Sequence, residues 1–573
     1  MNVPKKMPIS NFVSVKEDKN GALKEISFMN EDTFNFAFDI ADAIADREPD
    51  RRAMIHISKD GTERIYTFGD MKRHSSRVAN YLSFLGIKKG DRVMLVLKRH
   101  YQFWFTLLAL HKIGAVAVPA TNLLLKSDFE YRFKKGRIDA VICTADGDVS
   151  YEIDKAARGN KNIKHKIMVG GRRSGWRSLN KDVKYFSSHF PKPEGDDYAG
   201  GDDPMVMFFT SGTTEYPKLA VHSYRYPLGH YITAKYWQNV DPEGVHFSIS
   251  DTGWAKALWG KIYGQWMCDA CIFTYDFDKF DAKEILRMID KYKITTFCAP
   301  PTVYRVMVHL KLEKYDLSSL KHVVTAGEAL NPEIFNRFKE KTGLSIMEGL
   351  GQTETTLTIG NLIGTEPHPG SLGKPSPLYD VQLMLPDGTM AESYEEGEIV
   401  IYVGDPALGK EHPPCGLFLG YYEDEEKTKA VWHDGYYHTG DTAYIDDEGY
   451  YWYVGRTDDL IKSSGYRIGP FEIENEIMKL PYVLECAVTA VPDPIRGQAI
   501  KASIVLANGI EASDKLRSDI MKSLKKNIAS YKWPKVLDFQ AELPKTFSGK
   551  IQRKEIRNRD YQIEDKEKNE DDK

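Results

Sequence analysis

The sequence lacks any run of about 18 apolar residues, the length that a transmembrane helix needs. Its N-terminal segment, MNVPKKMPISNFVSVKEDKN, contains no apolar signal core, and its acidic residues are atypical of an Arg-rich transit peptide. The 78 Lys and Arg residues are balanced by 82 Asp and Glu residues, so no excess of basic charge attracts nucleic acid or an anionic membrane. We therefore expect a cytoplasmic protein whose partners are neither nucleic acids nor membranes.

Cysteine is also scarce, with six residues in a chain of 573. This number is too small for a disulfide framework and favours a reducing compartment. Cys268 and Cys271 have the spacing of a redox or zinc motif, but no second pair accompanies them. Because they precede an apolar stretch, we interpret both thiols as core residues.

The chain is too long for one hydrophobic core, because domains usually contain about 100–200 residues. From Arg92 onward, strand patterns alternate with helical patterns, which indicates parallel sheets covered by helices on both faces. The composition becomes polar and rich in glycine around residues 455–470, which predicts a boundary to a smaller C-terminal unit. We predict strands at residues 92–97, 115–120, 140–145, 295–300 and 322–327, and helices at residues 101–114 and 282–293 and from Pro301 and Asn331.

Two common motifs are missing: the Walker A phosphate loop and the G-x-S-x-G nucleophile turn. Instead, TSGTTEYPK at residues 210–218 follows the apolar strand pattern MVMFF. Its backbone amides, hydroxyls and terminal lysine suit a polyphosphate. A Ser/Thr-rich surface turn is the alternative, but the position directly after a buried strand favours phosphate binding.

Three further motifs carry possible chemistry. EGLGQTE at residues 348–354 ends in a carboxylate that suits Mg²⁺, although such a segment also resembles a helix start. YHTGD at residues 437–441 and GRTDD at residues 455–459 offer an acceptor and a donor for ribose hydroxyls, or else only shape turns. PKTFSGK at residues 544–550 ends in a lysine that could neutralise a reacting phosphate or simply lie in solvent.

In this order and spacing, the motifs resemble those of the adenylate-forming superfamily, which includes acyl-CoA synthetases, carrier-protein adenylation domains and beetle luciferases. The resemblance extends from about residue 34 to residue 557 and is carried by TSGTTEYPK, GLGQTE, YHTGD, GRTDDLIKSSGYRIGPFEIE and PKTFSGK. DTGWAKALWG at residues 251–260 and SSGYRIGP are most similar to the acetyl-CoA and medium-chain acyl-CoA synthetase branch. The resemblance implies an AMP-forming ligase that uses ATP, Mg²⁺ and a carboxylic acid to form an acyl-adenylate, and then transfers the acyl group to CoA.

The resemblance also implies an α/β architecture. Residues 1–457 would form an N-terminal domain of two α/β sheet subdomains plus a distorted β-barrel. Residues 458–573 would form a small mobile α+β lid that turns about a hinge at Asp458. The active site would lie between the two domains, and the position of the lid would decide which half-reaction runs.

Residue roles follow from the same resemblance. Thr353 would lie near the α-phosphate, Glu354 would hold Mg²⁺, and Asp441 and Arg456 would bind the ribose. Lys550 would bridge the substrate carboxylate and the α-phosphate. The positions implied to bind ATP are Thr210, Ser211, Gly212, Thr213, Thr214, Lys218, Gly327, Glu328, Ala329, Glu348, Gly349, Leu350, Gly351, Gln352, Thr353, Asp441, Arg456, Arg467 and Lys550.

After adenylation, rotation of the lid would withdraw Lys550 and bring in a second face. Ser464, Gly465 and Tyr466 would then guide the CoA thiol. Lys462, on the same strand, is implied to be catalytic in this step.

The acyl pocket departs from the acetate enzymes of the family. These have a tryptophan just before the Gln-Thr-Glu motif, where this chain has Gly351, and commonly have valines where it has Ala255 and Ala326. All three differences remove volume from the pocket wall, and each buried methylene contributes about 0.8 kcal/mol. We therefore expect an acid larger than acetate, such as propionate, a branched short-chain acid or a medium-chain acid.

Other residues of this stretch have open interpretations. Lys256 either reaches solvent, shapes the pocket or meets a polar group on the substrate. Trp254 and Trp259 form pocket walls or are only core aromatics, and we expect Cys298, in the strand pattern TTFCAP, on the same side of the site.

Two alternative functions remain open from the sequence. One is a stand-alone adenylating enzyme that loads a carrier protein, although no carrier domain is appended to this chain. The other is a catalytically silent nucleotide-binding protein, against which the intact Lys550 and Glu354 argue. A luciferase-like oxygenase has no feature in its favour.

Overall fold

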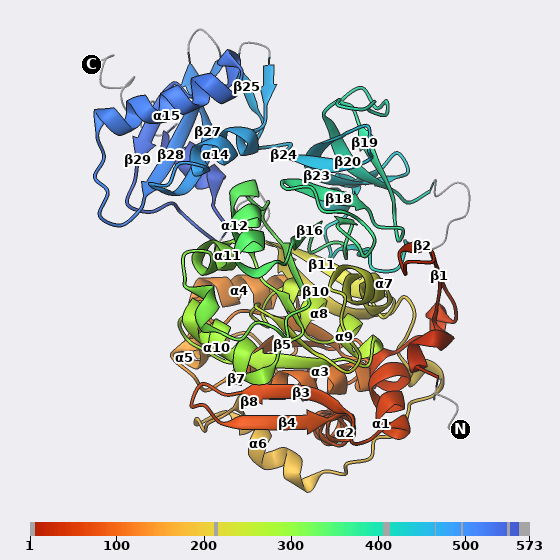
Figure 1. The fold of residues 1–573 in the computed structure, drawn as a ribbon. Coiled ribbons are helices and arrows are strands. Elements are labelled where there is room, and N and C mark those ends of the chain that lie inside the picture. Colours follow the sequence, from red (N-terminus) through yellow and green to blue (C-terminus); the bar gives the residue numbers. More distant parts are fainter. Residues whose placement is uncertain are drawn as a thin grey trace.

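The structure is a computed structural model that describes residues 6–210, 216–404, 413–463, 466–493, 497–546 and 550–560. Figure 1 shows a large body below, a β-rich unit at the upper right and a smaller unit, drawn in blue, at the upper left. The chain enters the blue unit after β24 (Tyr451–Arg456). Across the described ranges, no helix combines the length and the apolar character required to cross a membrane.

The first sheet has eight strands in the order β21-β11-β10-β6-β5-β7-β8-β9. The strands from β10 to β9 are parallel, whereas β11 and β21 pair antiparallel at the other edge. The strands predicted at residues 92–97, 115–120 and 140–145 are confirmed as β5, β6 and β7. The bounds are β5 Arg92–Val96, β6 Val116–Pro119, β7 Ala140–Thr144, β8 His165–Val169, β9 Arg177–Ser178, β10 Pro204–Thr210, β11 Lys218–Ser223 and β21 Gly420–Tyr421.

The second sheet contains a parallel core in the order β16-β15-β14-β12-β13-β3, with β4 paired antiparallel at its edge. The strands predicted at residues 295–300 and 322–327 are confirmed as β14 and β15. The bounds are β3 Arg52–Ile57, β4 Glu63–Thr67, β12 Val245–Ser248, β13 Cys271–Tyr275, β14 Thr296–Cys298, β15 His322–Ala326 and β16 Ile346–Leu350.

The expected β-barrel is wrong as a closed structure. Its strands continue the second sheet from β16 through β17 and β18, so that the pairing order β19-β20-β23-β24-β18-β17-β16 stays open. The physical reason is that β18 pairs with β17 along one part and with β24 along another, which extends the ladder instead of closing it. The bounds are β17 Ile359–Gly360, β18 Ser371–Pro375, β19 Asp380–Met384, β20 Gly397–Tyr402, β22 Trp432–His433, β23 Tyr436–Ile445 and β24 Tyr451–Arg456.

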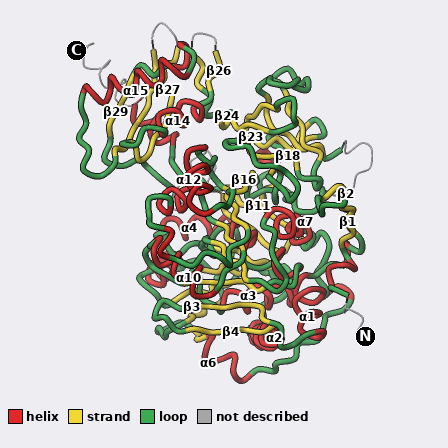
Figure 2. The backbone as a smooth tube through the Cα atoms, viewed as in Figure 1, coloured by secondary structure: helices red, strands yellow, loops and turns green. Residues whose placement is uncertain are grey.

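Helices surround both sheets of the body (Figure 2), and their ends follow local chemistry. In α12, the Asn331 side chain accepts a hydrogen bond from the Glu333 backbone, Pro332 is the first helical residue, and Gly343 ends the helix at φ +75°. The predicted helices are confirmed as α3, α10, α11 and α12. The bounds are α1 Ala43–Arg47, α2 Phe68–Phe84, α3 Gln102–Ile113, α4 Lys126–Lys135, α5 Val149–Ala156, α6 Leu179–Asp182, α7 Tyr226–Ile232, α8 Ala255–Gly260, α9 Tyr263–Met267, α10 Ala282–Tyr292, α11 Pro301–Met307, α12 Pro332–Thr342 and α13 Glu425–Lys429.

The smaller unit has its own hydrophobic core. Ile473 and Ile477 of α14 pack with Ile520 and Leu524 of α15 over the sheet β27-β28-β29. The boundary predicted between residues 457 and 458 lies in the connection from β24 to β25 and stays a prediction. The bounds are β25 Ile461–Ser463, β26 Tyr466–Ile468, α14 Pro470–Met478, β27 Val483–Asp493, β28 Gly497–Leu506, α15 Asp514–Asn527 and β29 Val536–Phe539.

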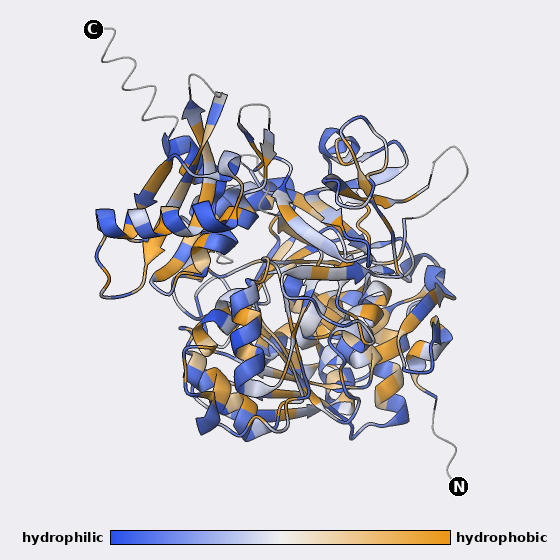
Figure 3. Ribbon diagram, turned by 45° about the horizontal axis from the view of Figure 1, so that its top comes forward, coloured by the Kyte–Doolittle hydropathy of each residue, from blue (hydrophilic) through white to orange (hydrophobic). Residues whose placement is uncertain are grey.

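Apolar residues gather where helices and strands meet (Figure 3), and the cysteines belong to this interior. All six are buried and unpaired, which confirms the core interpretation of Cys268 and Cys271. Within the described ranges, no group of three or more His, Cys, Asp or Glu residues could hold a metal ion.

Candidate active site

A cleft of about 960 Å³ lies between the body and the C-terminal unit and collects the motif residues. Its floor comes from the loops after β15 and β16, and one wall comes from β23 and β24. The C-terminal unit supplies the other wall, including Lys550 and Arg553. Segments far apart in the sequence thus meet in one concave site.

The first motif begins where β10 and β11 form an antiparallel pair. Thr210 ends β10 opposite Lys218 at the start of β11, and both line the cleft. The Lys218 ammonium lies 4.7 Å from the centre of the Tyr421 ring, and burial lowers its pKa. The positions Ser211, Gly212, Thr213 and Thr214 lie outside the described residues.

The turn after β15 is shaped by Gly327 and Glu348. Gly327 has φ +105°, a conformation that favours glycine, and the chain then passes Glu328 and Ala329 along the cleft. The buried Glu348 carboxylate accepts a hydrogen bond from the Leu330 backbone amide at 2.8 Å. Burial raises the pKa of Glu348 to about 8, so this side chain is largely neutral at pH 7 and supports the turn.

Gln352 joins the second motif to the third. Its side-chain amide nitrogen donates to Asp441 Oδ2 at 2.6 Å and to the Thr439 carbonyl at 2.8 Å. The Tyr437 hydroxyl donates to its amide oxygen at 2.7 Å. Gly349, Leu350 and Gln352 all line the same cleft, so residues about 90 positions apart form one polar wall.

Glu354 is buried and held by a tyrosine that the motif analysis did not single out. The Tyr421 hydroxyl donates to Glu354 Oε1 at 2.8 Å. Burial raises the pKa of this carboxyl group, while Lys218 and Arg456 favour its charged form. A cation placed in the cleft would therefore stabilise the carboxylate. One carboxylate fits a Mg²⁺ ion that takes its other oxygen ligands from phosphates and water, although no protein cage of several ligands surrounds it in the described ranges.

Behind this carboxylate, His222 of β11 fixes the preceding residue. Its Nε2 donates to the Thr353 carbonyl at 2.7 Å, and burial lowers the pKa of the imidazole to about 4. His222 is thus a neutral donor at pH 7, and its tautomer is defined because a carbonyl can only accept.

Arg456 lies at the exit of β24, where the body meets the C-terminal unit. Its guanidinium donates to the Thr439 carbonyl at 2.9 Å and lies 3.5 Å from Asp441. The same side chain reaches Asp458 Oδ1 at 3.3 Å. The Tyr453 hydroxyl donates a hydrogen bond to Asp441 Oδ1 at 3.1 Å.

The C-terminal unit presents one of its two expected faces to the cleft. Lys550, whose backbone amide donates to Thr546 Oγ1 at 3.2 Å, lines the cleft. Lys462 is exposed on β25, and the exposed Tyr466 stacks on Tyr531 with ring centres 4.4 Å apart; neither lines the cleft. Ser464 and Gly465, and the side chain of Arg467, lie outside the described part of the structure.

The proposed acyl wall is assembled at α8 and β15. Trp254 precedes α8 and is partly exposed, whereas Ala255 and Ala326 are buried. The Lys256 ammonium donates to the Ala326 carbonyl at 2.5 Å, and the side chain is half-buried, which favours the interpretation that it shapes the pocket. Burial lowers its pKa, and the nearby Cys298 is itself buried at the end of β14.

Gly351 does not leave an empty space. A Cβ atom at this position would collide with the ring of Trp259 and with the Thr356 carbonyl. The expectation that Gly351 simply removes volume is therefore corrected, because Trp259 of α8 occupies the place beside it. Trp259 is buried and lies directly beside Gly351.

Sequence reasoning missed the residues that support the motifs from outside them. Tyr421, His222 and Trp237 belong to no recognisable motif, yet they contact Glu354, Thr353 and the backbone of Glu348. The only sign of their role in the sequence is local, because each is an aromatic or imidazole side chain that carries a polar atom within an apolar segment. Such groups usually need a buried hydrogen-bond partner, but the sequence does not say which.

Comparisons with known proteins agree with this geometry. The AMP-binding enzyme family matches residues 41–410, and the AMP-binding enzyme C-terminal domain matches residues 472–550. The acyl-coenzyme A synthetase ACSM3, mitochondrial, of Homo sapiens is 37% identical over 562 residues, which cover 96% of this chain and 93% of the relative. The acyl-coenzyme A synthetase ACSM4, mitochondrial, of Rattus norvegicus is 37% identical over 538 residues, covering 92% and 91%.

Solved structures show the same architecture. The anthranilate CoA ligase AuaEII in complex with anthranoyl-AMP superposes with a TM-score of 0.84 at 27% identity, covering 93% of this chain and 98% of that one. An acyl-CoA synthetase of Brucella canis gives a TM-score of 0.68 at 30% identity, covering 94% and 96%. With both family domains matched and a single cleft holding the motif residues, the chain belongs to the AMP-binding, adenylate-forming enzyme family, in its acyl-CoA synthetase branch.

Proposed function

We propose that this AMP-forming acyl-CoA synthetase activates a carboxylic acid larger than acetate. The observation that carries the reaction is the shared cleft, in which Thr353, Glu354 and Asp441 of the body face the same space as Lys550 of the C-terminal unit. ATP and CoA are the co-substrates, as in the acyl-CoA synthetases to which the chain is similar.

The first half-reaction needs charge neutralisation more than a protein nucleophile, because a carboxylate must approach a polyphosphate. In this proposal Thr210 and Lys218 hold the phosphates, and Asp441 and Arg456 bind the ribose. Lys550 orients the substrate carboxylate and stabilises charge at the α-phosphate. Glu354 would hold a Mg²⁺ ion, which would supply further positive charge to the phosphates.

The second half-reaction uses the opposite face of the C-terminal unit. Lys550 lines the cleft while Lys462 and Tyr466 do not, which suits the adenylate-forming arrangement. We propose that rotation about Asp458, next to Arg456, exchanges these faces and brings Ser464, Gly465 and Tyr466 toward the CoA thiol, with Lys462 catalytic and Arg467 at a phosphate. The Arg456–Asp458 ion pair would have to break or re-form in this motion.

The size of the acid is proposed from the small side chains at Ala255 and Ala326. Since Trp259 fills the space beside Gly351, the acyl chain would extend past these alanines and along the tryptophan ring. A propionate, a branched short-chain acid or a medium-chain acid would fill this space better than acetate.

The test is pyrophosphate release with ATP, Mg²⁺ and acids of about two to ten carbons, with and without CoA. Steady turnover only with CoA, and best with an acid longer than acetate, is expected. An optimum at acetate would refute the pocket proposal, and a single burst that CoA does not convert to turnover would indicate a carrier protein as acceptor. No release with any acid would indicate a silent nucleotide-binding protein.

A cytoplasmic location remains part of the proposal. The curated relatives are named as mitochondrial, which is a statement about those proteins. Fractionation of the native cells with a marker for each compartment decides between the two locations.

A further inference from the structure

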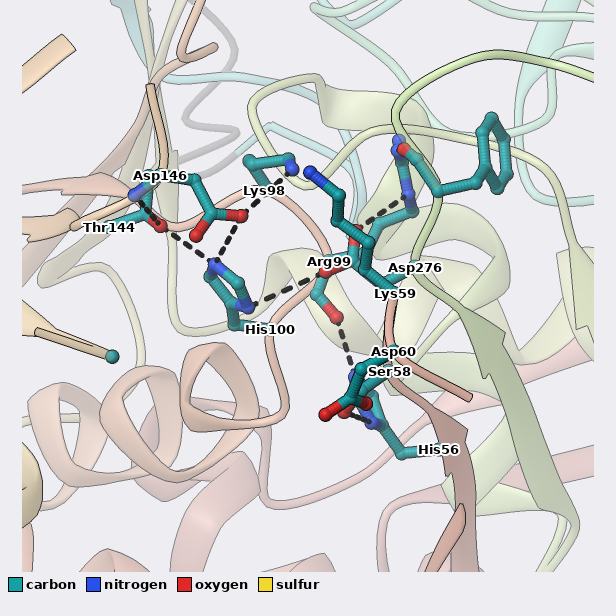
Figure 4. Close-up of polar contacts among 12 residues, drawn as sticks. His56, Ser58, Lys59, Asp60, Lys98, Arg99, His100, Thr144, Asp146 and Asp276 are labelled. Atoms are coloured by element: carbon teal, nitrogen blue, oxygen red, sulfur yellow. Dashed lines mark hydrogen bonds and ion pairs between the residues drawn. The ribbon is translucent and has the colours of Figure 1, made fainter. Parts of the chain in front are cut away.

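A network of charged side chains lies where strands of the two sheets end next to each other (Figure 4). Lys98, Arg99 and His100 follow β5 of the first sheet, and Asp146 follows β7. Asp276 follows β13 of the second sheet. These strands are parallel within their sheets, so the network sits at carboxyl ends, where α/β proteins place polar sites.

Opposite charges alternate across the junction. His100 lies between Asp146 and Asp276, 3.6 Å and 3.5 Å away, and accepts or donates a hydrogen bond with Thr144 at 2.7 Å. The Lys98 ammonium lies 3.1 Å from Asp146 and 2.8 Å from Asp278. These contacts join the first sheet to the second, and Figure 4 shows them side by side.

Arg99 extends from this network to the acyl segment. Its Nη1 donates to Asp251 Oδ2 at 3.2 Å, and its guanidinium carbon lies 4.1 Å from the centre of the Phe277 ring. A second guanidinium nitrogen donates to the Phe277 carbonyl. The Arg99 side chain is only 11% exposed, and its Nε lies 3.7 Å from Asp276 Oδ1, which connects it to the network.

Asp251 in turn forms the tight turn that leads into α8. Its carboxylate accepts from the Gly253 amide at 2.9 Å, and its carbonyl accepts from the Trp254 amide at 3.2 Å. A side chain on Gly253 would collide with the backbone of Thr121, just after β6 of the first sheet. The turn that carries Trp254 therefore packs closely on the backbone after β6, and Arg99 binds the carboxylate of Asp251 in this turn.

We propose that Arg99 is a positioning residue for the acid: by holding Asp251, it sets the turn that places Trp254, Ala255 and Lys256 beside the acyl chain. This inference rests on the proposed acyl pocket. Arg99 is separated from the substrate by Asp251, so it would act on acid affinity and acid selectivity and leave ATP binding unchanged. A displacement of about 1 Å at such a site can cost about 100-fold in rate.

A purely structural role for the network predicts a different result. In that case the loss of Arg99 lowers the stability of the enzyme. The smaller fraction of folded enzyme then lowers the apparent rate by the same factor whichever substrate is varied. The matched control is Arg92, which lies at the opposite end of the same strand and pairs with Asp139 at 2.9 Å, away from the acyl segment.

The experiment measures KM and kcat for ATP and for a panel of acids in the full-length wild type and in Arg99→Met, Arg99→Lys, Asp251→Asn and Arg92→Met. Arg99→Met is expected to raise the KM for the acid at least tenfold and to change the order of preference among acids, with the KM for ATP within twofold. Arg99→Lys keeps the charge without the planar fork and should recover part of the affinity. Arg92→Met should leave both constants unchanged.

The double variant Arg99→Met/Asp251→Asn should have a KM for the acid no higher than that of the poorer single variant, because both changes break the same interaction between Arg99 and Asp251. An unchanged acid profile in Arg99→Met, or a similar change in Arg92→Met, overturns the inference. If Arg99→Met does not fold, Arg99→Lys and Asp251→Asn carry the same test. Failure of the wild type to turn over any acid refutes the proposed function instead, so the two failures are distinguishable.

Discussion

The ring of Trp259 lies against the backbone of Gly351, in the space that a side chain at that position would occupy. One residue belongs to helix α8 and the other follows strand β16, so two segments distant in the sequence meet at this point. A glycine in the motif and a tryptophan in the helix therefore form a complementary pair, on which the size of the proposed acyl pocket would depend.

This pair can be tested by substitution. Gly351→Ala should cost about 1–3 kcal/mol of stability and lower acid turnover, because its methyl group collides with Trp259. Trp259→Leu should shift the acid optimum toward longer chains. In the Trp259→Leu background, Gly351→Ala should be better tolerated, which urea unfolding and acid-panel kinetics would show. An alanine that is harmless beside an unaltered Trp259 would contradict the proposed contact.

Tyr421 should act on Mg²⁺ binding through Glu354. Tyr421→Phe removes the hydrogen bond that orients the carboxylate, which should cost about 1 kcal/mol of Mg²⁺ binding. The Mg²⁺ concentration that gives half the maximal rate should therefore rise roughly fivefold. Pyrophosphate release measured against Mg²⁺ concentration would show the shift. Tyr379→Phe is the control, because this buried tyrosine bonds Thr356 instead. Equal shifts in both variants would argue against a specific role for Tyr421.

Lys550 should matter for one half-reaction only. Lys550→Ala is expected to lose at least 100-fold in acyl-adenylate formation, because the positive charge at the reacting phosphate is removed. Transfer from preformed acyl-adenylate to CoA should be retained. Lys545→Ala is a matched control on the same loop, where the lysine pairs with Glu485. Equal loss of both half-reactions would show that the assigned role is wrong.

His222 should make stability depend on pH. Its pKa is about 4 in the folded chain against 6.5 when exposed, so the unfolded chain binds the proton more readily. Stability is therefore complete above pH 6.5 and falls as the pH drops toward 4, by about 1.4 kcal/mol per pH unit for this group. His222→Gln keeps a donor for the Thr353 carbonyl but does not titrate. Its free energy of unfolding should fall less than that of the wild type between pH 6.5 and pH 4.5; parallel curves would count against the prediction.

The sequence predicted most of the elements that place the site. The strands and helices around residues 92–145 and 282–342 follow clear apolar periodicities, and these patterns depend only on neighbours along the chain. The open sheet was not predictable in this way, because the pairing of β18 with both β17 and β24 is a long-range choice. The contact between Trp259 and Gly351 was hidden for the same reason: each residue has an ordinary local sequence, and only the fold brings them together.

The open second sheet has a mechanical consequence. Hydrogen-bonded neighbours run without interruption from β4 at one edge to β19 at the other, so the strand that ends in Ala326 and the strand that carries Asp441 belong to one ribbon. Separating these two strands would require breaking ladder hydrogen bonds. The continuous ladder thus resists separation of these two strands, and the proposed hinge lies beyond the end of the ladder, after Arg456.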